Sequence, residues 1–381
     1  MEKKQCLNGF WDFSMEVSMD TFTDTADKDS VVWDSHQICV PSPYNVNAFA
    51  PIREKKIADE TFYVQGGDFC LYPSYPQEWN NAPCGAYRRT FFIPVESKDK
   101  RIFLHFDAVA YHSKFYVNGI MVKEEVEAFL PIEIEITDVA RFGDDNEIIV
   151  VAENSKKYMY KDEKDWNRID YPKGSFWGEF VAGIWQDVWY VERPVTYISD
   201  VFVVTDIWEE TLTAQFELDG EKKDWKIRFS LIDLETKEVK ELGECDTSDK
   251  IFEWNYSGEE IKLWELENPA LYQLQAQLME GEQVRDTKLV RFGFRSFIAK
   301  GERFYLNKRP LNLKNDSWHY MGYSIQTESY ARNYYKMAKE AGVNIIRLHA
   351  QPFPSFFCWI VGIGDLENIH YSRVSNAPMN L

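Results

Sequence analysis

The 381-residue chain carries 62 Asp and Glu residues against 43 Lys and Arg, which leaves a formal net charge of −19. A negative field of this size repels nucleic acid and anionic membrane surfaces, so neither is an expected partner. At about 150 residues per domain, the length predicts two or three domains, each large enough to bury its own core.

The six cysteines show neither a CxxC pair nor metal-ligand spacing, which predicts reduced thiols and no bound metal or other cofactor. The first residues lead directly into a strand pattern without an apolar signal-peptide core. The longest apolar run, around residues 356–363, is too short to span a bilayer. We therefore expect a soluble cytoplasmic protein, and a homo-oligomer is compatible with this composition.

Residues 1–194 are expected to form one all-β domain. Apolar and polar residues alternate with a period of two along residues 102–106 and 132–137, as in strands with one face on a core and the other in water. Asn118-Gly119 between two such runs is a strong signal for a hairpin turn. No helical period longer than two turns interrupts the pattern, so a β-sandwich is predicted.

Residues 195–298 are expected to form a second β-domain. Short strand patterns separated by charged turns occur at residues 198–205, 212–218, 226–232 and 273–278. About seven short strands in roughly 100 residues are typical of an immunoglobulin-like sandwich. The segment has no cluster of titratable residues, which favours a structural role between two other domains.

Residues 299–381 begin differently, with a strand–helix–strand pattern. Two strand-like runs, 304–307 and 311–314, surround the turn at residues 308–310, and a buried strand with apolar residues on both faces is predicted at 343–348. Between them, a helix that ends at Gly342 is predicted from residues at helical spacing: Tyr330, Tyr334, Met337, Ala338 and Ala341. Such a βαβ unit has two parallel, adjacent strands, whose carboxyl ends lie at the same edge of the sheet.

Motifs in this order along the chain resemble those of glycoside hydrolase family 2, which contains β-galactosidases, β-glucuronidases and β-mannosidases. The motifs that carry the resemblance are residues 7–13 (LNGFWDF), 40–41 (VP), 85–91 (GAYRRTF), 117–119 (VNG), 182–188 (AGIWQDV), 263–272 (LWELENPALY), 292–295 (FGFR), 304–310 (FYLNKRP) and 341–349 (AGVNIIRLH). The resemblance implies a mostly β chain: a jelly-roll-like, sugar-binding-type sandwich, an immunoglobulin-like sandwich, then the start of a TIM barrel that is truncated at residue 381.

Retaining hydrolysis of a β-glycoside requires two carboxyl groups about 5 Å apart. The resemblance places both on later barrel strands, and one of them follows an asparagine. The one Asn-Glu pair here, Asn146-Glu147, belongs to the first domain's strand pattern and is read as structural. No catalytic residue is therefore named, and the chain is predicted to be an inactive amino-terminal part of a glycosidase.

The resemblance also implies one wall of a sugar site at the carboxyl ends of the two parallel strands. Arg347 would line the barrel interior, with an ion pair as an equal alternative to substrate contact, and His319 and His349 would donate hydrogen bonds to sugar hydroxyls. Asp316 and Trp318 flank the same edge, where packing within a loop is the favoured alternative. The implied ligand is a β-glycoside or oligosaccharide.

Two segments depart from the family pattern. Relatives carry an aspartate six residues before the glycine matched by Gly183, where this chain has Trp177, with Glu179 nearby. After residue 357 the resemblance ends, which indicates a frame change or truncated product in preference to a divergent third strand. The alternative functions are a stand-alone carbohydrate-binding module, for which the loop residue Trp79 is the candidate stacking surface, and one half of a split glycosidase.

Overall fold

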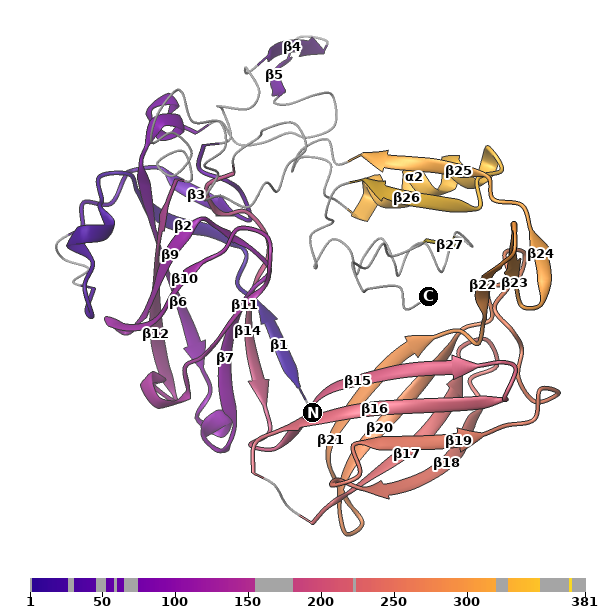
Figure 1. Ribbon diagram of the computed structural model, residues 1–381. Coiled ribbons are helices and arrows are strands. Elements are labelled where there is room, and N and C mark those ends of the chain that lie inside the picture. The colour runs from indigo at the N-terminus through magenta and orange to yellow at the C-terminus, as the bar shows by residue number, and fades with distance from the viewer. Residues whose placement is uncertain are drawn as a thin grey trace.

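The computed structural model describes residues 2–26, 31–45, 53–57, 60–64, 75–154, 181–221, 224–319, 328–349 and 370–371. Most of the described elements are strands, arranged in two β-sandwiches followed by a smaller part with parallel strands (Figure 1). In Figure 1 the second sandwich joins the first sandwich to the strands β25 and β26.

The first sandwich has a four-stranded sheet, in the order β1-β14-β7-β11, and a six-stranded sheet, in the order β10-β9-β12-β6-β2-β3, with all pairs antiparallel. The smaller sheet contains β1 (Lys3–Cys6), β14 (Val188–Arg193), β7 (Arg101–Phe106) and β11 (Ile132–Glu135). The larger contains β10 (Ile120–Val126), β9 (His112–Val117), β12 (Asp144–Glu153), β6 (Cys84–Ile93), β2 (Gly9–Ser14) and β3 (Gln37–Val40).

Shorter elements complete this part of the chain. They are the pairs β8 (Val109–Ala110) with β13 (Gly183–Ile184) and β4 (Arg53–Ile57) with β5 (Glu60–Val64), and the 3₁₀ turns Met19–Thr21, Gln77–Asn81, Val95–Asp99 and Thr137–Val139.

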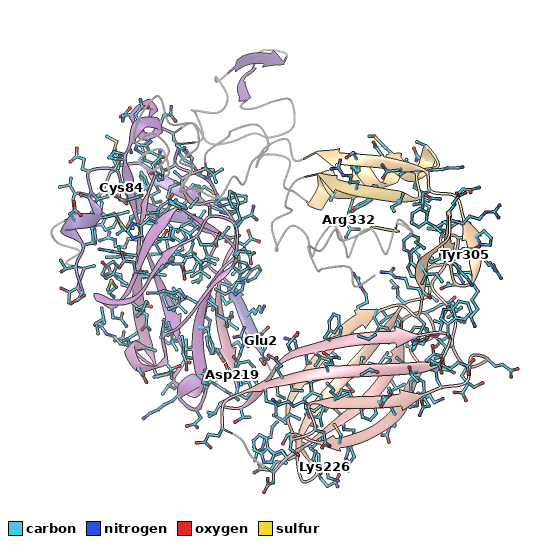
Figure 2. All side chains as sticks on the ribbon, in the orientation of Figure 1. Glu2, Cys84, Asp219, Lys226, Tyr305 and Arg332 are labelled. Atoms are coloured by element: carbon cyan, nitrogen blue, oxygen red, sulfur yellow. The ribbon has the colours of Figure 1, made fainter. Side chains whose placement is uncertain are left out.

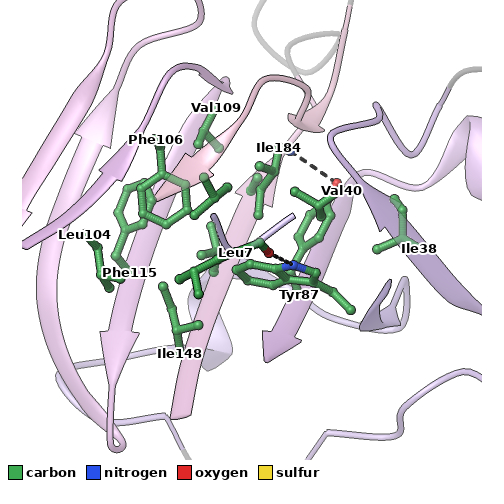
Figure 3. Packing of buried hydrophobic residues seen from close by; sticks show 14 of the residues in the cluster. Leu7, Ile38, Val40, Tyr87, Leu104, Phe106, Val109, Phe115, Ile148 and Ile184 are labelled. Carbon is green, nitrogen blue, oxygen red and sulfur yellow. Dashed lines mark hydrogen bonds between the residues drawn. The ribbon is translucent and has the colours of Figure 1, made fainter. Parts of the chain in front are cut away.

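One core lies between the two sheets of the first sandwich (Figure 3). The predicted alternation is confirmed: Ile132 and Ile134 are buried while the intervening Glu133 and Glu135 are exposed. Two polar side chains inside the core bond to backbone groups: Trp11 Nε1 donates to the carbonyl of Leu7 at 2.9 Å, and Tyr87 Oη accepts from Ile184 N at 3.3 Å.

The predicted hairpin is also confirmed, since Asn118 and Gly119 connect β9 to β10 with φ of 52° and 84°. Asn118 Nδ2 donates to Asn146 Oδ1 at 2.8 Å, and Asn146 is completely buried. Asn146 lies within β12 and therefore has a structural role.

The second sandwich packs the sheet β15-β16-β19 against the sheet β18-β17-β20-β21 around its own apolar core. Its strands are β15 (Tyr197–Asp206), β16 (Thr211–Asp219), β19 (Ile251–Asn255), β18 (Val239–Asp246), β17 (Lys226–Asp233), β20 (Tyr272–Glu280) and β21 (Gln283–Phe292). Phe229 stacks on Phe252 across the two sheets, with ring centroids 4.3 Å apart and planes 15° apart.

A small antiparallel sheet of β22 (Phe297–Lys300), β23 (Arg303–Leu306) and β24 (Arg309–Leu311) follows the second sandwich. The turn between β23 and β24 places Asn307 and Lys308 in the left-handed region, with φ of 47° and 70°. Asn307 is buried, and its side chain reaches back to the second sandwich, which fixes the sheet to that domain.

The strand–helix–strand unit consists of β25 (Asn315–His319), α2 (Glu328–Glu340) and β26 (Ile345–His349), and β25 and β26 pair in parallel as predicted. The first strand lies later than the predicted 311–314. The reason is Asn344, whose side chain accepts from Lys314 N at 2.8 Å and donates to Asn312 O at 2.9 Å. These bonds hold residues 312–314 as an irregular segment before the strand, and parallel pairing with β26 starts at Asn315.

Helix α2 ends as predicted, in a Schellman motif with Gly342 at φ +79°. Gly342 N donates to Lys339 O at 2.9 Å, and Val343 N donates to Ala338 O at 2.9 Å. Its predicted apolar face was partly wrong. Among the helix residues whose side chains are described, Ala331, Tyr335 and Ala338 are buried, whereas Met337 is 63% exposed and Ala341, just after the helix, is exposed. The side chain of Tyr330 lies outside the described part of the structure. The true stripe is shifted by one position, which rotates the face by about 100°.

A two-residue strand, β27 (His370–Tyr371), pairs in parallel with β26. The choice between a frame change and a divergent third strand after residue 357 stays a prediction, because this pairing involves only two residues of the tail. The rest of residues 350–381 lies outside the described part of the chain.

Candidate functional site

The candidate site lies at the carboxyl ends of β25 and β26. The parallel register pairs Ser317 with Arg347 and His319 with His349, the last residues of the two strands. The predicted meeting of the two strand ends is therefore present in the backbone. The side chains of Trp318, His319 and His349 lie outside the described part of the structure.

Asp316 does not share the face of Arg347. Its Oδ2 accepts a hydrogen bond from Tyr334 Oη of helix α2 at 2.9 Å, and its Oδ1 accepts one from Ser317 N at 2.7 Å. Successive residues in a strand point to opposite faces, so Asp316 lies on the helix side and Arg347, paired with Ser317, on the other. Both described contacts of Asp316 are therefore made within the strand–helix–strand unit.

Arg347 is exposed, and no ion pair with its guanidinium occurs among the residues that the structure describes. An exposed arginine on the face opposite the helix can contact a carboxylate or hydroxyl ligand without first breaking an internal salt bridge. The ion-pair alternative for Arg347 has no partner in the described ranges.

A hollow of about 540 Å³ lies at the other end of this unit. It is lined by residues of β23 and β24, by the residue before β23 and by the two residues that follow β24: Glu302, Arg303, Phe304, Pro310, Leu311, Asn312 and Leu313. These residues precede the amino end of β25, so the hollow does not coincide with the strand ends that carry His319 and His349.

Trp79 is not a sugar-stacking surface, contrary to the candidate role for a carbohydrate-binding module. It is completely buried in the first sandwich, and its Nε1 donates to Asp34 Oδ2 at 3.1 Å. Its ring lies 4.3 Å from that of Phe13 and 5.1 Å from that of Tyr75. A ring with no exposed surface has no face left for a sugar.

The sequence analysis did not predict the hydrogen-bonding roles of two polar residues near the site, Tyr334 and Asn344. Tyr334 was placed on the apolar face of the helix, although its hydroxyl binds Asp316. Asn344 was read as part of an apolar strand, although its amide orders residues 312–314. A single polar residue inside an apolar run was the available signal for Asn344. Trp177 and Glu179 lie outside the described residues.

Three negative findings apply to the described ranges. They contain no group of three or more His, Cys, Asp or Glu residues arranged to hold a metal ion. None of the four cysteines described there, Cys6, Cys39, Cys84 and Cys245, forms a disulfide. No helix in those ranges has the length and apolar character needed to cross a membrane.

Comparison with known proteins identifies the class. Residues 4–194 match the profile of the sugar-binding domain of glycosyl hydrolases family 2, and residues 196–295 match a second family 2 profile. The chain therefore belongs to glycosyl hydrolase family 2.

Among curated relatives, a β-galactosidase from Streptococcus thermophilus is 26% identical over 92% of this chain and 33% of its own length. A β-glucuronidase from Streptococcus agalactiae is 23% identical over 61% of this chain and 39% of its length. The chain spans between a third and about two-fifths of the length of the curated relatives it matches. The β-glucuronidase from Ruminococcus gnavus in complex with D-glucuronic acid superposes over 97% of this chain with a TM-score of 0.69 and 19% identity, which shows a shared fold.

Proposed function

We propose that this chain is the amino-terminal part of a family 2 β-glycosidase, in which two β-sandwiches precede the first strands of a TIM barrel. The observation that carries the proposal is the order of the parts. Two consecutive family 2 matches are followed by a parallel strand–helix–strand unit whose strand ends bring His319 and His349 into register. In a TIM barrel, this carboxyl edge is where catalytic and binding residues gather.

The proposed substrate class is a β-glycoside, and hydrolysis would belong to the complete catalytic barrel. Arg347 lies exposed on the face opposite α2, where it would contact a sugar hydroxyl or carboxylate. The relatives include both β-galactosidases and β-glucuronidases, so the comparisons do not favour one sugar. The present chain is proposed to be inactive alone, because its sequence offers no carboxylate pair for retaining chemistry.

The test is hydrolysis of chromogenic β-galactoside, β-glucuronide and β-mannoside by the purified chain. We expect no turnover above a blank. Turnover that copurifies with the chain and is lost with a glycosidase inhibitor would overturn the proposed inactivity. A second arm adds a separately expressed barrel segment from a relative. Activity in the mixture alone would support the split-glycosidase form of the proposal.

The stand-alone binding module is disfavoured by the burial of Trp79. Its remaining test is calorimetric titration of the chain with oligosaccharides. Tight binding that survives Arg347→Ala would locate a sugar site on the sandwiches and replace the glycosidase proposal.

A further inference from the structure

Two arginines lie where the first sandwich meets the second. Arg101 is the first residue of β7 and Arg193 the last residue of β14, and both belong to the same sheet of the first sandwich. Tyr197 begins β15 of the second sandwich, only four positions after Arg193 along the chain. Figure 2 labels Glu2 and Asp219, which bind these arginines, at this meeting point of the two domains.

Both guanidinium groups stack against the same two aromatic rings, one from each domain. The guanidinium carbon Cζ of Arg101 lies 5.2 Å from the centroid of the Phe103 ring and 5.5 Å from the centroid of the Tyr197 ring. The corresponding distances for Arg193 are 4.7 Å and 5.1 Å. The two rings pack edge to face at 6.3 Å, and both residues are buried. Arginine over an aromatic face gains cation–π attraction that increases as water is excluded.

Carboxylates fix the orientation of each guanidinium. Glu133 binds Arg193 through two bonds of 2.6 and 2.7 Å, and Glu135 binds Arg101 through two bonds of 2.6 and 3.0 Å. Arg101 then crosses to the second sandwich, with its Nη1 3.1 Å from Asp219 Oδ1. Two parallel hydrogen bonds between a guanidinium and a carboxylate fix the geometry of both groups. The bonds from Glu135 therefore preorganise Arg101 for its contact with Asp219 of the second sandwich.

Asp219 also receives a hydrogen bond from Tyr197 Oη at 2.7 Å, so the ring and the carboxylate of the second sandwich hold each other in place. The side chains of Arg101 and Arg193 are 19% and 12% exposed. The carboxylates of Glu135 and Asp219 are 39% and 46% exposed, so water partly screens these ion pairs. The well-covered part of the contact is the stack of the two arginines on the Phe103 and Tyr197 rings.

The backbone makes an equally close contact at the same junction. Gly220 has φ +109°, and a Cβ added there would collide with the carbonyl oxygen of Val195 and with Thr196. Thr196 is buried, and its Oγ1 donates to the carbonyl of Glu221 at 3.3 Å. The connection between the sandwiches is therefore packed directly against the turn after β16.

We propose that Arg101, Arg193, Phe103, Tyr197 and Asp219 form an interdomain clamp that holds the two sandwiches as one rigid body. Neighbouring domains in one chain ordinarily move relative to each other unless their interface is strong. Here a stacked and hydrogen-bonded cluster supplies that strength within a small area. If the proposed glycosidase function is correct, the clamp also fixes how the first sandwich is presented to the strand ends of β25 and β26.

The primary test compares Arg101→Ala with Arg88→Ala by hydrogen exchange and small-angle X-ray scattering on the full chain. Arg88 is a matched control, because it pairs with Asp12 at 2.6 Å and covers the Trp33 ring at 4.5 Å within one domain. Arg101→Ala should raise amide exchange in residues 195–199 and 219–221 by roughly tenfold or more and increase the radius of gyration. Arg88→Ala should change neither quantity. Unchanged exchange and scattering in Arg101→Ala would overturn the clamp.

Two further variants keep the proposal testable if Arg101→Ala does not fold. Asp219→Asn removes the charge that crosses between domains but keeps an acceptor for Tyr197, so it should increase exchange at the same segments by a smaller factor. Gly220→Ala should also increase amide exchange at these segments, and by more than Gly281→Ala does. An added Cβ at Gly220 collides with Val195, whereas at Gly281, which has φ +57°, no atom lies within 4 Å of it. Equal behaviour of the two glycine variants, or wild-type exchange in Asp219→Asn, would contradict the clamp. These readouts do not involve a sugar, so they are independent of the proposed glycosidase function.

Discussion

Asn307 Nδ2 donates a hydrogen bond to the carbonyl oxygen of Trp264 at 2.7 Å, and this bond joins the small sheet β22–β24 to the second sandwich. On its other side, Asn307 Oδ1 accepts from Ser296 N at 3.0 Å, while Asn307 N donates to Ser296 O at 2.9 Å. Asparagine suits this place because it tolerates the left-handed φ of 47° and carries both a donor and an acceptor. One side chain thus organises the connection between two parts of the chain.

Replacing Asn307 by alanine is expected to reduce the free energy of unfolding by about 2–4 kcal/mol, because the buried carbonyl of Trp264 and the half-buried N–H of Ser296 lose their partners and alanine is strained at this φ. Urea unfolding followed by tryptophan fluorescence measures this change. Asn307→Gly is the matched control, since it loses the same hydrogen bonds but removes the backbone strain, and it should be less destabilising than alanine. An alanine variant as stable as the wild type would show that the bonds do not hold the junction.

His105 predicts a pH dependence of stability on the alkaline side. Burial alone would lower the pKa of His105, but hydrogen bonds to Asp107 and Glu133 outweigh it and raise the pKa to about 9. The ring contacts are 3.1 Å to Asp107 and 3.3 Å to Glu133. A raised folded-state pKa means that the stabilisation is complete below the unfolded-state pKa near 6.5 and is lost as the pH rises through about 9.

Between pH 6 and pH 9.5 the free energy of unfolding is expected to fall by roughly 1–3 kcal/mol, because solvent partly screens the charge on His105. Urea unfolding at both pH values checks it, with His105→Gln as the comparison. The glutamine variant should lose less stability over this interval than the wild type. Parallel pH curves for the two proteins would assign the alkaline effect to other groups.

The sequence predicted the β-sandwiches and the parallel unit well where a period of two, an Asn-Gly turn or a Gly helix end dominates local structure. Residues 132–135, Asn118-Gly119 and Gly342 are examples. Prediction was poorer where a side chain distant in sequence determines where a strand or helix face lies. Asn344 moves the start of β25 by its contacts to Asn312 and Lys314, and no local pattern in residues 311–319 contains that information.

The same distinction applies to the candidate site. The meeting of β25 and β26 at one edge follows from the topology of a βαβ unit and was predictable. The contact of Asp316 with Tyr334 depends on the rotation of α2, which the apolar stripe misplaced by one residue. The arginine stack between the sandwiches joins residues 96 positions apart in sequence, Arg101 and Tyr197, and no motif marks it.

Trp79→Ala is expected to destabilise the first sandwich by about 3–5 kcal/mol, since it removes a fully buried ring and leaves a cavity beside Phe13 and Tyr75. Trp79→Phe should destabilise the sandwich less, because phenylalanine keeps much of the buried side-chain volume. Thermal unfolding measures both. A Trp79→Ala variant with wild-type stability and reduced oligosaccharide binding would restore the surface role that burial argues against.

Arg347→Ala is expected to leave stability nearly unchanged, within about 0.5 kcal/mol, because the side chain is exposed and has no ion pair in the described part of the chain. A contact to one sugar hydroxyl in an open site contributes about 0.5–1.5 kcal/mol, which is too little for micromolar binding. Calorimetric titration of the chain with galactose, glucuronate or mannose should therefore give no heat at micromolar protein, with or without Arg347. Asp316→Ala provides the contrast, since it breaks the contact with Tyr334 and should lower stability by about 1 kcal/mol without affecting sugar titrations. If Arg347→Ala instead destabilised the chain more than Asp316→Ala, the arginine would be a structural residue and its proposed place at the sugar site would be wrong.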